Sequence, residues 1–166
     1  KKGQAMIADF KKRPDVILAG IAMDENRYIT SLGEIGIEVR LADINEVFSD
    51  AIIVPVETDG SMAGGAAAGV KEAGGEEIEK EARGMAPIEP GSAVSAQPGK
   101  LPTGNVILAA VKDGSGAITS GSVKTALSAA LGEAEALDAE TVAVPGLGFV
   151  EGGTDAAGSA ASVIEA

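Results

Sequence analysis

The stretch DAIIVPVETDGSMAGGAAAGVKEAGG, from Asp50 to Gly75, decides the fold of this chain. It opens on a short apolar run, residues 50–56, whose length and composition predict a strand covered on both faces, as parallel or central strands are. A run of glycine and alanine follows, in which no side chain between Met62 and Val70 is larger than a methyl group. Because residues 69–84 have the composition of a helix with an acidic exposed face, the stretch predicts a strand, a loop and a helix in that order.

The glycine- and alanine-rich run, Met62 to Val70, has two interpretations. The first is structural: a connector, or a loop and helix start that pack closely against a neighbouring strand. The second is functional: backbone N–H groups that no side chain shields form a nest and wrap a diphosphate. The residues of this run alone do not decide between the two.

The remaining sequence alternates candidate strands with candidate helices. We expect strands at 15–23, 35–44, 50–56, 91–97, 105–112 and 140–146, and helices at 69–84, 122–137 and 154–166. Apolar residues of the strand at 35–44 alternate onto one face, and residues 24–34 before it are polar and typical of a turn. This alternation of elements predicts an α/β fold with helices on both faces of a mixed sheet.

Composition excludes several kinds of site. The chain has 166 residues, enough for one domain with a real core, and only 2% are aromatic, so the core is built from aliphatic side chains. It contains no cysteine and no histidine, which excludes disulfides, thiolate metal sites and catalysis by histidine. We expect neither a metal ion nor a cofactor.

Charge and apolar patterning bear on partners and location. The formal net charge of −12 argues against nucleic-acid binding, because phosphates are neutralised by lysine and arginine. The longest apolar runs are too short and too often interrupted to cross a bilayer, and residues 1–15 lack the apolar region of a signal peptide. We expect a cytoplasmic protein with no nucleic-acid and no membrane partner.

A second glycine-rich segment, PGLGFVEGG, runs from Pro145 to Gly153. Gly146, Gly148 and Gly152 superficially resemble the fingerprint of a dinucleotide-binding Rossmann fold. We reject that interpretation because the sequence does not supply the further strand with an acidic residue that such a fold needs. Like the first run, this segment follows a strand and opens onto a helix, where free N–H groups face anions. The two segments together favour a ligand that carries phosphates.

Taken as a series, these segments resemble the macro domain family. Residues 41–75 are similar to the family's opening, G-D-I-T followed by D-A-I-V-N-A-A-N and a glycine-rich run. Residues 91–111 and 141–153 are similar to its later stretches, G-x-L-P…V-I-H-A-V and P-G-L-G-T-G-V-G-G. The resemblance implies a three-layer α/β/α sandwich with a mixed central sheet, and recognition of ADP-ribose or of ADP-ribosylated molecules.

The resemblance covers residues 34–166, which we expect to form the macro-like domain, with residues 1–33 as an N-terminal extension. The family normally finishes on a strand, whereas this sequence finishes on a predicted helix. Either the chain is incomplete, or the segment at 15–23 adds the missing edge strand.

The resemblance also assigns binding residues. Asp43 matches the acidic residue that accepts a hydrogen bond from the adenine amino group, and Ile44 matches the backbone beside it. Outside this motif, an aspartate near a strand end is more typical of a turn or a helix cap. The first loop, which meets the distal ribose and the diphosphate, contains Gly64, Gly65, Ala66 and Gly69, and the second phosphate-binding loop contains Gly148, Phe149, Val150 and Gly152.

Several positions depart from the pattern of the hydrolytic members. Those members carry an asparagine pair and, in one branch, an aspartate, where this chain has Val54, Glu57 and Ala67. Glu57 is the weak candidate for a replacement general base; the alternative, a solvated loop carboxylate, is preferred. Further departures are Lys71 and Leu108 in place of histidines, and Val150 and Glu151 in the second loop, where a glutamate near a diphosphate opposes binding.

Three functions are compatible with these residues. The leading hypothesis is a module that binds ADP-ribose or ADP-ribosylated molecules without strong catalysis. The second is an enzyme that removes ADP-ribose from esters or from modified proteins, using Glu57 or a water held by the substrate. The third is a structural or regulatory domain that has lost the ligand of the macro fold.

Overall fold

Strand β4 (Ser49–Val56) lies inside a four-stranded sheet, as its apolar run predicts. The computed structural model describes residues 21–22, 27–32, 34–112 and 114–147. The order of strands in this main sheet is β5 (Ala93–Ala96), β6 (Thr103–Ala110), β4 and β7 (Val142–Ala143). Strands β6 and β7 run parallel to β4, and β5 runs antiparallel to β6, so the sheet is mixed.

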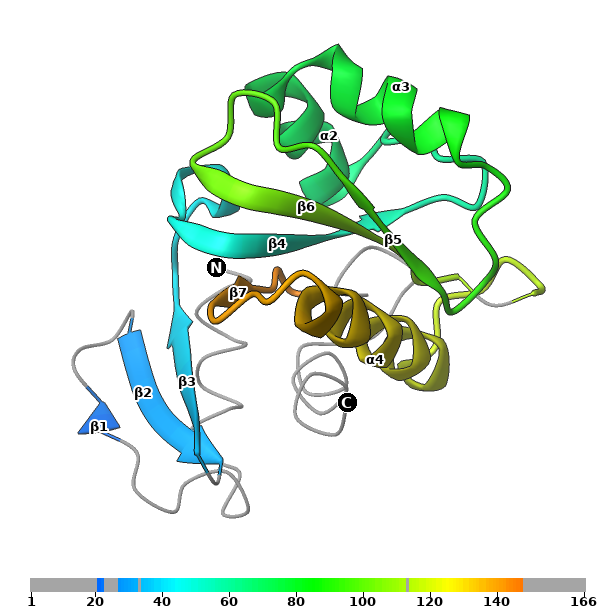
Figure 1. Ribbon diagram of the computed structural model, residues 1–166. Coiled ribbons are helices and arrows are strands. Elements are labelled where there is room, and N and C mark those ends of the chain that lie inside the picture. The colour runs from blue at the N-terminus through cyan, green and yellow to red at the C-terminus, as the bar shows by residue number, and fades with distance from the viewer. Residues whose placement is uncertain (1–20, 23–26, 33, 113, 148–166) are drawn as a thin grey trace.

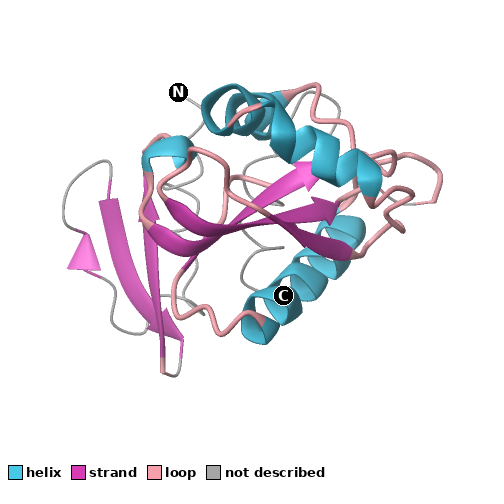
Figure 2. Cartoon of the chain, turned by 45° about the horizontal axis from the view of Figure 1, so that its top comes forward, coloured by secondary structure: helices cyan, strands magenta, loops and turns pink. Residues whose placement is uncertain are grey.

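Helices cover both faces of the main sheet: α2 (Gly65–Gly74) and α3 (Glu76–Gly84) lie on one face, and α4 (Ser120–Ala136) lies on the other (Figures 1 and 2). Successive residues of β4 point to opposite faces. Ile52 and Val54 pack in the core under α2 and α3, whereas Ala51 and Ile53 pack in the core under α4. All of them are buried, which is why the run is continuously apolar. The predicted three-layer α/β/α sandwich is confirmed.

The single helix predicted at 69–84 is wrong: the chain forms two helices instead. Helix α2 ends where Gly75 N donates to the carbonyl of Lys71 at 2.8 Å. Gly75 then takes φ +110°, a conformation open to glycine and unfavourable for other residues, and α3 starts in a new direction. None of the helices in the described residues is both long and apolar enough to span a membrane.

A second, three-stranded antiparallel sheet consists of β1 (Ile21–Ala22), β2 (Arg27–Leu32) and β3 (Ile35–Arg40). It lies beside the main sheet rather than within it (Figure 1). The prediction of a turn is wrong for residues 27–32, because the β-branched and aromatic residues of RYITSL form β2, and residues 24–26 and 33 lie outside the described residues. Only the end of the strand predicted at 15–23 falls in the described residues, as β1. The expected boundary between residues 33 and 34 falls between β2 and β3, which pair with each other.

The strand predicted at 35–44 stops at Arg40, and a 3-10 helix, η1 (Ile44–Glu46), follows before β4. The apolar face predicted for the strand at 35–44 is not buried: Ile35 is 66% exposed and Leu41 is 48% exposed. The helix predicted at 122–137 is confirmed as α4, which begins two residues earlier. A reciprocal pair of hydrogen bonds between Thr119 and Ser122, each 3.0 Å long, caps it. The helix predicted at 154–166 lies outside the described residues.

Candidate functional site

Three parallel strands of the main sheet, β4, β6 and β7, point towards the same edge, and two of them end there together. The chain leaves β4 after Val56 and β6 after Ala110, which are register partners, whereas β7 ends at Ala143, the partner of Ile52, four residues before the end of β4. The segments that follow β4 and β6 therefore start at the same edge, where α/β sheets hold their ligands. The second glycine-rich loop is described only to Leu147, so Gly148, Phe149, Val150, Glu151 and Gly152 lie outside the described residues.

The first glycine-rich run is part loop and part helix. Gly64 is the N-cap of α2 and has no side chain to cap the helix, so the N–H groups of the first turn face the loop without a capping side chain. Gly64 and Gly65 are exposed, Ala66 is half-buried, and a Cβ built on Gly64 would have no atom within 4 Å. Ala67, in contrast, is buried in the core and faces away from the loop.

The segment before this helix start is a tight turn tied to α3. The amide of Gly60 donates to the carbonyl of Glu57 at 2.9 Å, and the amide of Ser61 donates to Asp59 Oδ1 at 2.9 Å. Met62 comes next, and its side chain is fully buried. These two hydrogen bonds and the buried Met62 hold the turn just before α2 begins.

A carboxylate of α3 holds this turn in place. Glu79 Oε1 accepts from the amide of Met62 at 3.0 Å, and its other oxygen accepts from Lys71 Nζ at 3.1 Å. Arg83 adds a hydrogen bond at 3.2 Å. These hydrogen bonds lower the pKa of Glu79 to about 2. The bond from the Met62 amide contributes most, and the bond from Lys71 comes second. Sequence reasoning missed this cluster, although Glu79 and Arg83 stand four residues apart on a predicted helix.

Asp43 and Ile44 lie beside α2, because η1 packs against that helix. Asp43 is the N-cap of η1, and its exposed side chain accepts from the amide of Asn45 at 3.0 Å. Ile44 is half-buried against the core. Gly69, on the facing side of α2, is the point of close approach: a Cβ built there would lie 3.3 Å from Asn45 Nδ2. The structure thus brings Asp43, Ile44 and Gly69 together along one flank of α2.

Glu57 forms an ion pair that the sequence did not indicate. Its Oε2 lies 2.7 Å from Lys112 Nζ, and the two side chains are 44% and 34% exposed. Val56 and Ala110 are register partners in β4 and β6, so the residues after them reach the same edge. The sequence signal for Lys112 is its place directly after an apolar run, but only the fold shows that this run pairs with the strand before Glu57.

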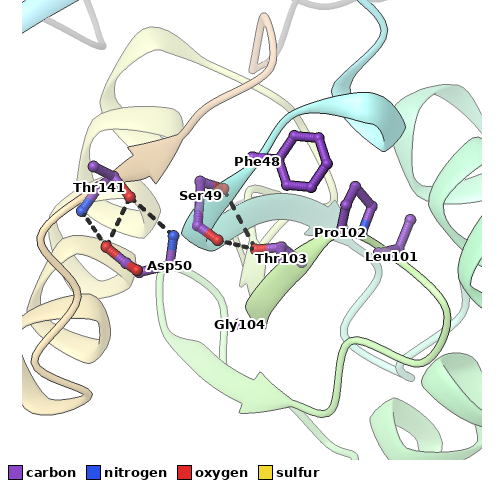
Figure 3. Close-up of a pocket in the computed structure, with 8 residues that line it drawn as sticks. All are labelled: Phe48, Ser49, Asp50, Leu101, Pro102, Thr103, Gly104 and Thr141. Atoms are coloured by element: carbon purple, nitrogen blue, oxygen red, sulfur yellow. Dashed lines mark hydrogen bonds between the residues drawn. The ribbon is translucent and has the colours of Figure 1, made fainter.

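A separate hollow of about 480 Å³ lies at the opposite edge of the sheet, where β4 and β6 begin (Figure 3). Its polar groups bind one another: Asp50 Oδ2 accepts from the amide of Thr141 at 2.8 Å and from its hydroxyl at 2.7 Å. These bonds lower the pKa of Asp50 and tie the chain before β7 to β4. Within the residues that the structure describes, no cluster of acidic side chains could hold a metal ion.

A family model and related sequences both match most of this chain. The model of the macro domain family matches residues 53–163. A protein of Aquifex aeolicus is 39% identical over 130 residues, which are 78% of this chain and 79% of that protein. A protein of Mycobacterium tuberculosis is 38% identical over 120 residues, which are 72% of this chain but only 33% of that longer protein.

Solved structures share the fold at low identity. The macrodomain of Mycobacterium tuberculosis DarG superposes with a TM-score of 0.66 at 19% identity, over 75% of this chain and 84% of that one. The Oceanobacillus iheyensis macrodomain with ADP superposes with a TM-score of 0.74 at 14% identity, over 89% of this chain and 78% of that one.

Proposed function

The chain belongs to the macro domain family, and on that premise we propose that it binds ADP-ribose, or molecules that carry ADP-ribose, at the edge where β4 and β6 end. The observation that carries the proposal is the start of α2. Its N-terminus has no capping side chain and begins at two exposed glycines, so a diphosphate can approach its free N–H groups. The Oceanobacillus iheyensis macrodomain was solved with ADP, which supports the same class of ligand for this chain.

In this proposal, the ligand extends along α2. The diphosphate lies at Gly64 and Gly65, and the adenine lies at Asp43 and Ile44 beside Gly69. The glycines at the two ends are four to five residues apart in the helix, about 6–8 Å at 1.5 Å per residue. The second phosphate-binding loop, residues 148–152, stays a prediction from the resemblance.

We propose binding rather than catalysis. Val54 and Ala67, where hydrolytic members carry polar residues, are both buried in the core and cannot reach a ligand. Glu57 is held by Lys112 at 2.7 Å, so its structural role is that of an ion-pair partner. A general base needs a side chain placed to take a proton from water or substrate, and these positions do not supply one.

Isothermal titration calorimetry with ADP-ribose, with AMP and NAD as controls, tests the proposal. We expect saturable binding of ADP-ribose in the micromolar range, about 8 kcal/mol of binding free energy, with AMP much weaker. Absence of heat at high protein concentration would contradict the proposal and favour a structural or regulatory domain.

Asp43→Ala is expected to weaken ADP-ribose binding about tenfold, because a hydrogen bond to a carboxylate contributes about 1.5 kcal/mol or more. The matched control is Glu46→Ala, which removes another exposed carboxylate of η1 that does not cap the helix. Equal losses in both variants would show that net charge, and not the adenine contact, is responsible. A thermal melt of each variant checks that loss of the cap has not unfolded the chain.

Lys112→Met is expected to lower ADP-ribose affinity several-fold, more at low salt, because Glu57 then faces the diphosphate without a counter-ion. Adding Glu57→Gln to Lys112→Met should restore the affinity. Lys80→Met is the control, since Lys80 pairs with Glu77 on the exposed face of α3. Calorimetry at low and at physiological salt measures the effect, and a loss that Glu57→Gln does not repair would contradict this account.

A further inference from the structure

We propose that Asn45, seated against Gly69, is the positioning residue that makes Asp43 select an amino-purine over an oxo-purine. This inference rests on the proposed function, because it concerns the adenine end of the same ligand. It adds Asn45, to which the motif assigned no role.

Asn45 holds one oxygen of Asp43 with two donors. Its backbone amide donates to Asp43 Oδ1 at 3.0 Å, and its side-chain Nδ2 donates to the same oxygen at 2.8 Å. In the described part of the chain, no other residue donates to this carboxylate. A carboxylate offers two oxygens, so Oδ2 stays available as an acceptor while Oδ1 fixes the rotation of the group.

The orientation of the Asn45 amide is set by the same contact. Its Oδ1 is buried and has no hydrogen-bond partner among the described residues. If the amide were rotated by half a turn, its Oδ1 would take the place of Nδ2 and would lie next to Asp43 Oδ1. Two acceptors would then face each other without a donor between them. Leaving a buried amide oxygen unpaired is unfavourable. The Asn45 amide nevertheless keeps this orientation, because only this orientation lets Nδ2 donate to Asp43.

Gly69 provides the room for this amide. A Cβ at position 69 would lie 3.3 Å from Asn45 Nδ2, closer than most side-chain contacts, so any larger residue would displace the amide. Helix α2 therefore sets the position of Asn45, and Asn45 sets the position of Asp43. Since the same helix starts at the proposed diphosphate site, the two ends of the ligand are placed by one rigid element.

Selectivity follows from the fixed acceptor. Asp43 Oδ2, which receives no donor from the described residues while Oδ1 is held by two, presents an acceptor to the ligand. Adenine offers an amino group at position 6, whereas hypoxanthine offers a carbonyl oxygen there, which would face the carboxylate as a second acceptor. A site that holds its polar group rigidly rejects the mismatched partner more strongly than a site whose group can turn away.

The test compares ADP-ribose with its hypoxanthine analogue, inosine diphosphate ribose, by calorimetry on the full chain. We expect wild type to prefer ADP-ribose by at least about tenfold. Asn45→Ala should lower ADP-ribose affinity and reduce the preference to about two- to threefold, with the analogue nearly unchanged. Asn45→Thr, which keeps a hydroxyl donor, should recover most of the preference.

Gly69→Ala should act in the same direction as Asn45→Ala but less strongly, and Gly132→Ala on α4, where a Cβ meets no atom within 4 Å, is its control. Equal losses for both ligands in Asn45→Ala, with the preference intact, would overturn the inference and leave the proposed function standing. Absence of ADP-ribose binding by wild type would overturn the proposed function, and the ligand role of Asn45 with it.

Discussion

Gly60→Ala is expected to destabilise the chain by about 3 kcal/mol or more and to abolish ADP-ribose binding with it. Gly60 has φ +75°, and a Cβ there would lie 2.6 Å from three backbone atoms of Ala82 and Arg83. Backbone atoms inside α3 cannot move aside as a flexible side chain can. Either the turn at 57–61 or the helix must therefore shift, and the start of α2 shifts with it. Urea unfolding followed by circular dichroism measures the loss.

Gly64→Ala is the matched control in the same loop. Gly64 has φ −150°, an extended conformation that alanine adopts freely, and a Cβ there meets no atom within 4 Å. We expect the free energy of unfolding to fall by at most about 1 kcal/mol, because alanine is less favourable than glycine at an N-cap. ADP-ribose binding should still weaken, because the new methyl group occupies the space in which the diphosphate is proposed to lie. Wild-type stability of Gly60→Ala would show that the turn is not held against α3.

Glu79→Ala is expected to cost about 2 kcal/mol or more of stability, because it removes the partner of a backbone amide and of two cations at once. The amide of Met62 would be left without its acceptor, and Lys71 and Arg83 would lose their hydrogen bonds. Glu77→Ala is the control: it breaks an exposed ion pair with Lys80, whose side chains are 77% and 83% exposed, and should cost almost nothing. Equal costs in the two variants would contradict a role for Glu79 in holding the loop.

The same cluster predicts a pH dependence. The folded protein lowers the pKa of Glu79 from 4.5 to about 2, so the folded state binds the proton less tightly than the unfolded state does. The stability from Glu79 is therefore fully present above pH 4.5 and is lost as the pH falls from 4.5 towards 2. Unfolding of wild type and of Glu79→Gln from about pH 6 to about pH 2 measures it. The difference between the two should shrink on acidification, and a constant difference would contradict the assignment.

Local patterns predicted the elements whose signal is contained within a few neighbouring residues. The apolar run of β4 and the 3–4 spacing of α4 are of this kind, because burial on a face imposes its periodicity on the sequence directly. The polar composition of RYITSL indicated an exposed turn, whereas these residues form the hairpin strand β2. The break between α2 and α3 could not be predicted, because glycine also occurs inside helices. Composition does not indicate that Gly75 has a positive φ.

By itself, the sequence determined the layered α/β architecture, the place of the first glycine-rich run between β4 and α2, and the placement of Asp43 and Ile44 in a recognisable motif. Tertiary structure alone decided which side chains pair there: Lys112 with Glu57, Glu79 with the Met62 amide, and Asn45 with Asp43 beside Gly69. The physical reason is that secondary structure depends on periodicity along the chain. Ion pairs and hydrogen bonds between elements depend instead on strand register and helix position, which packing sets only when the whole chain has folded.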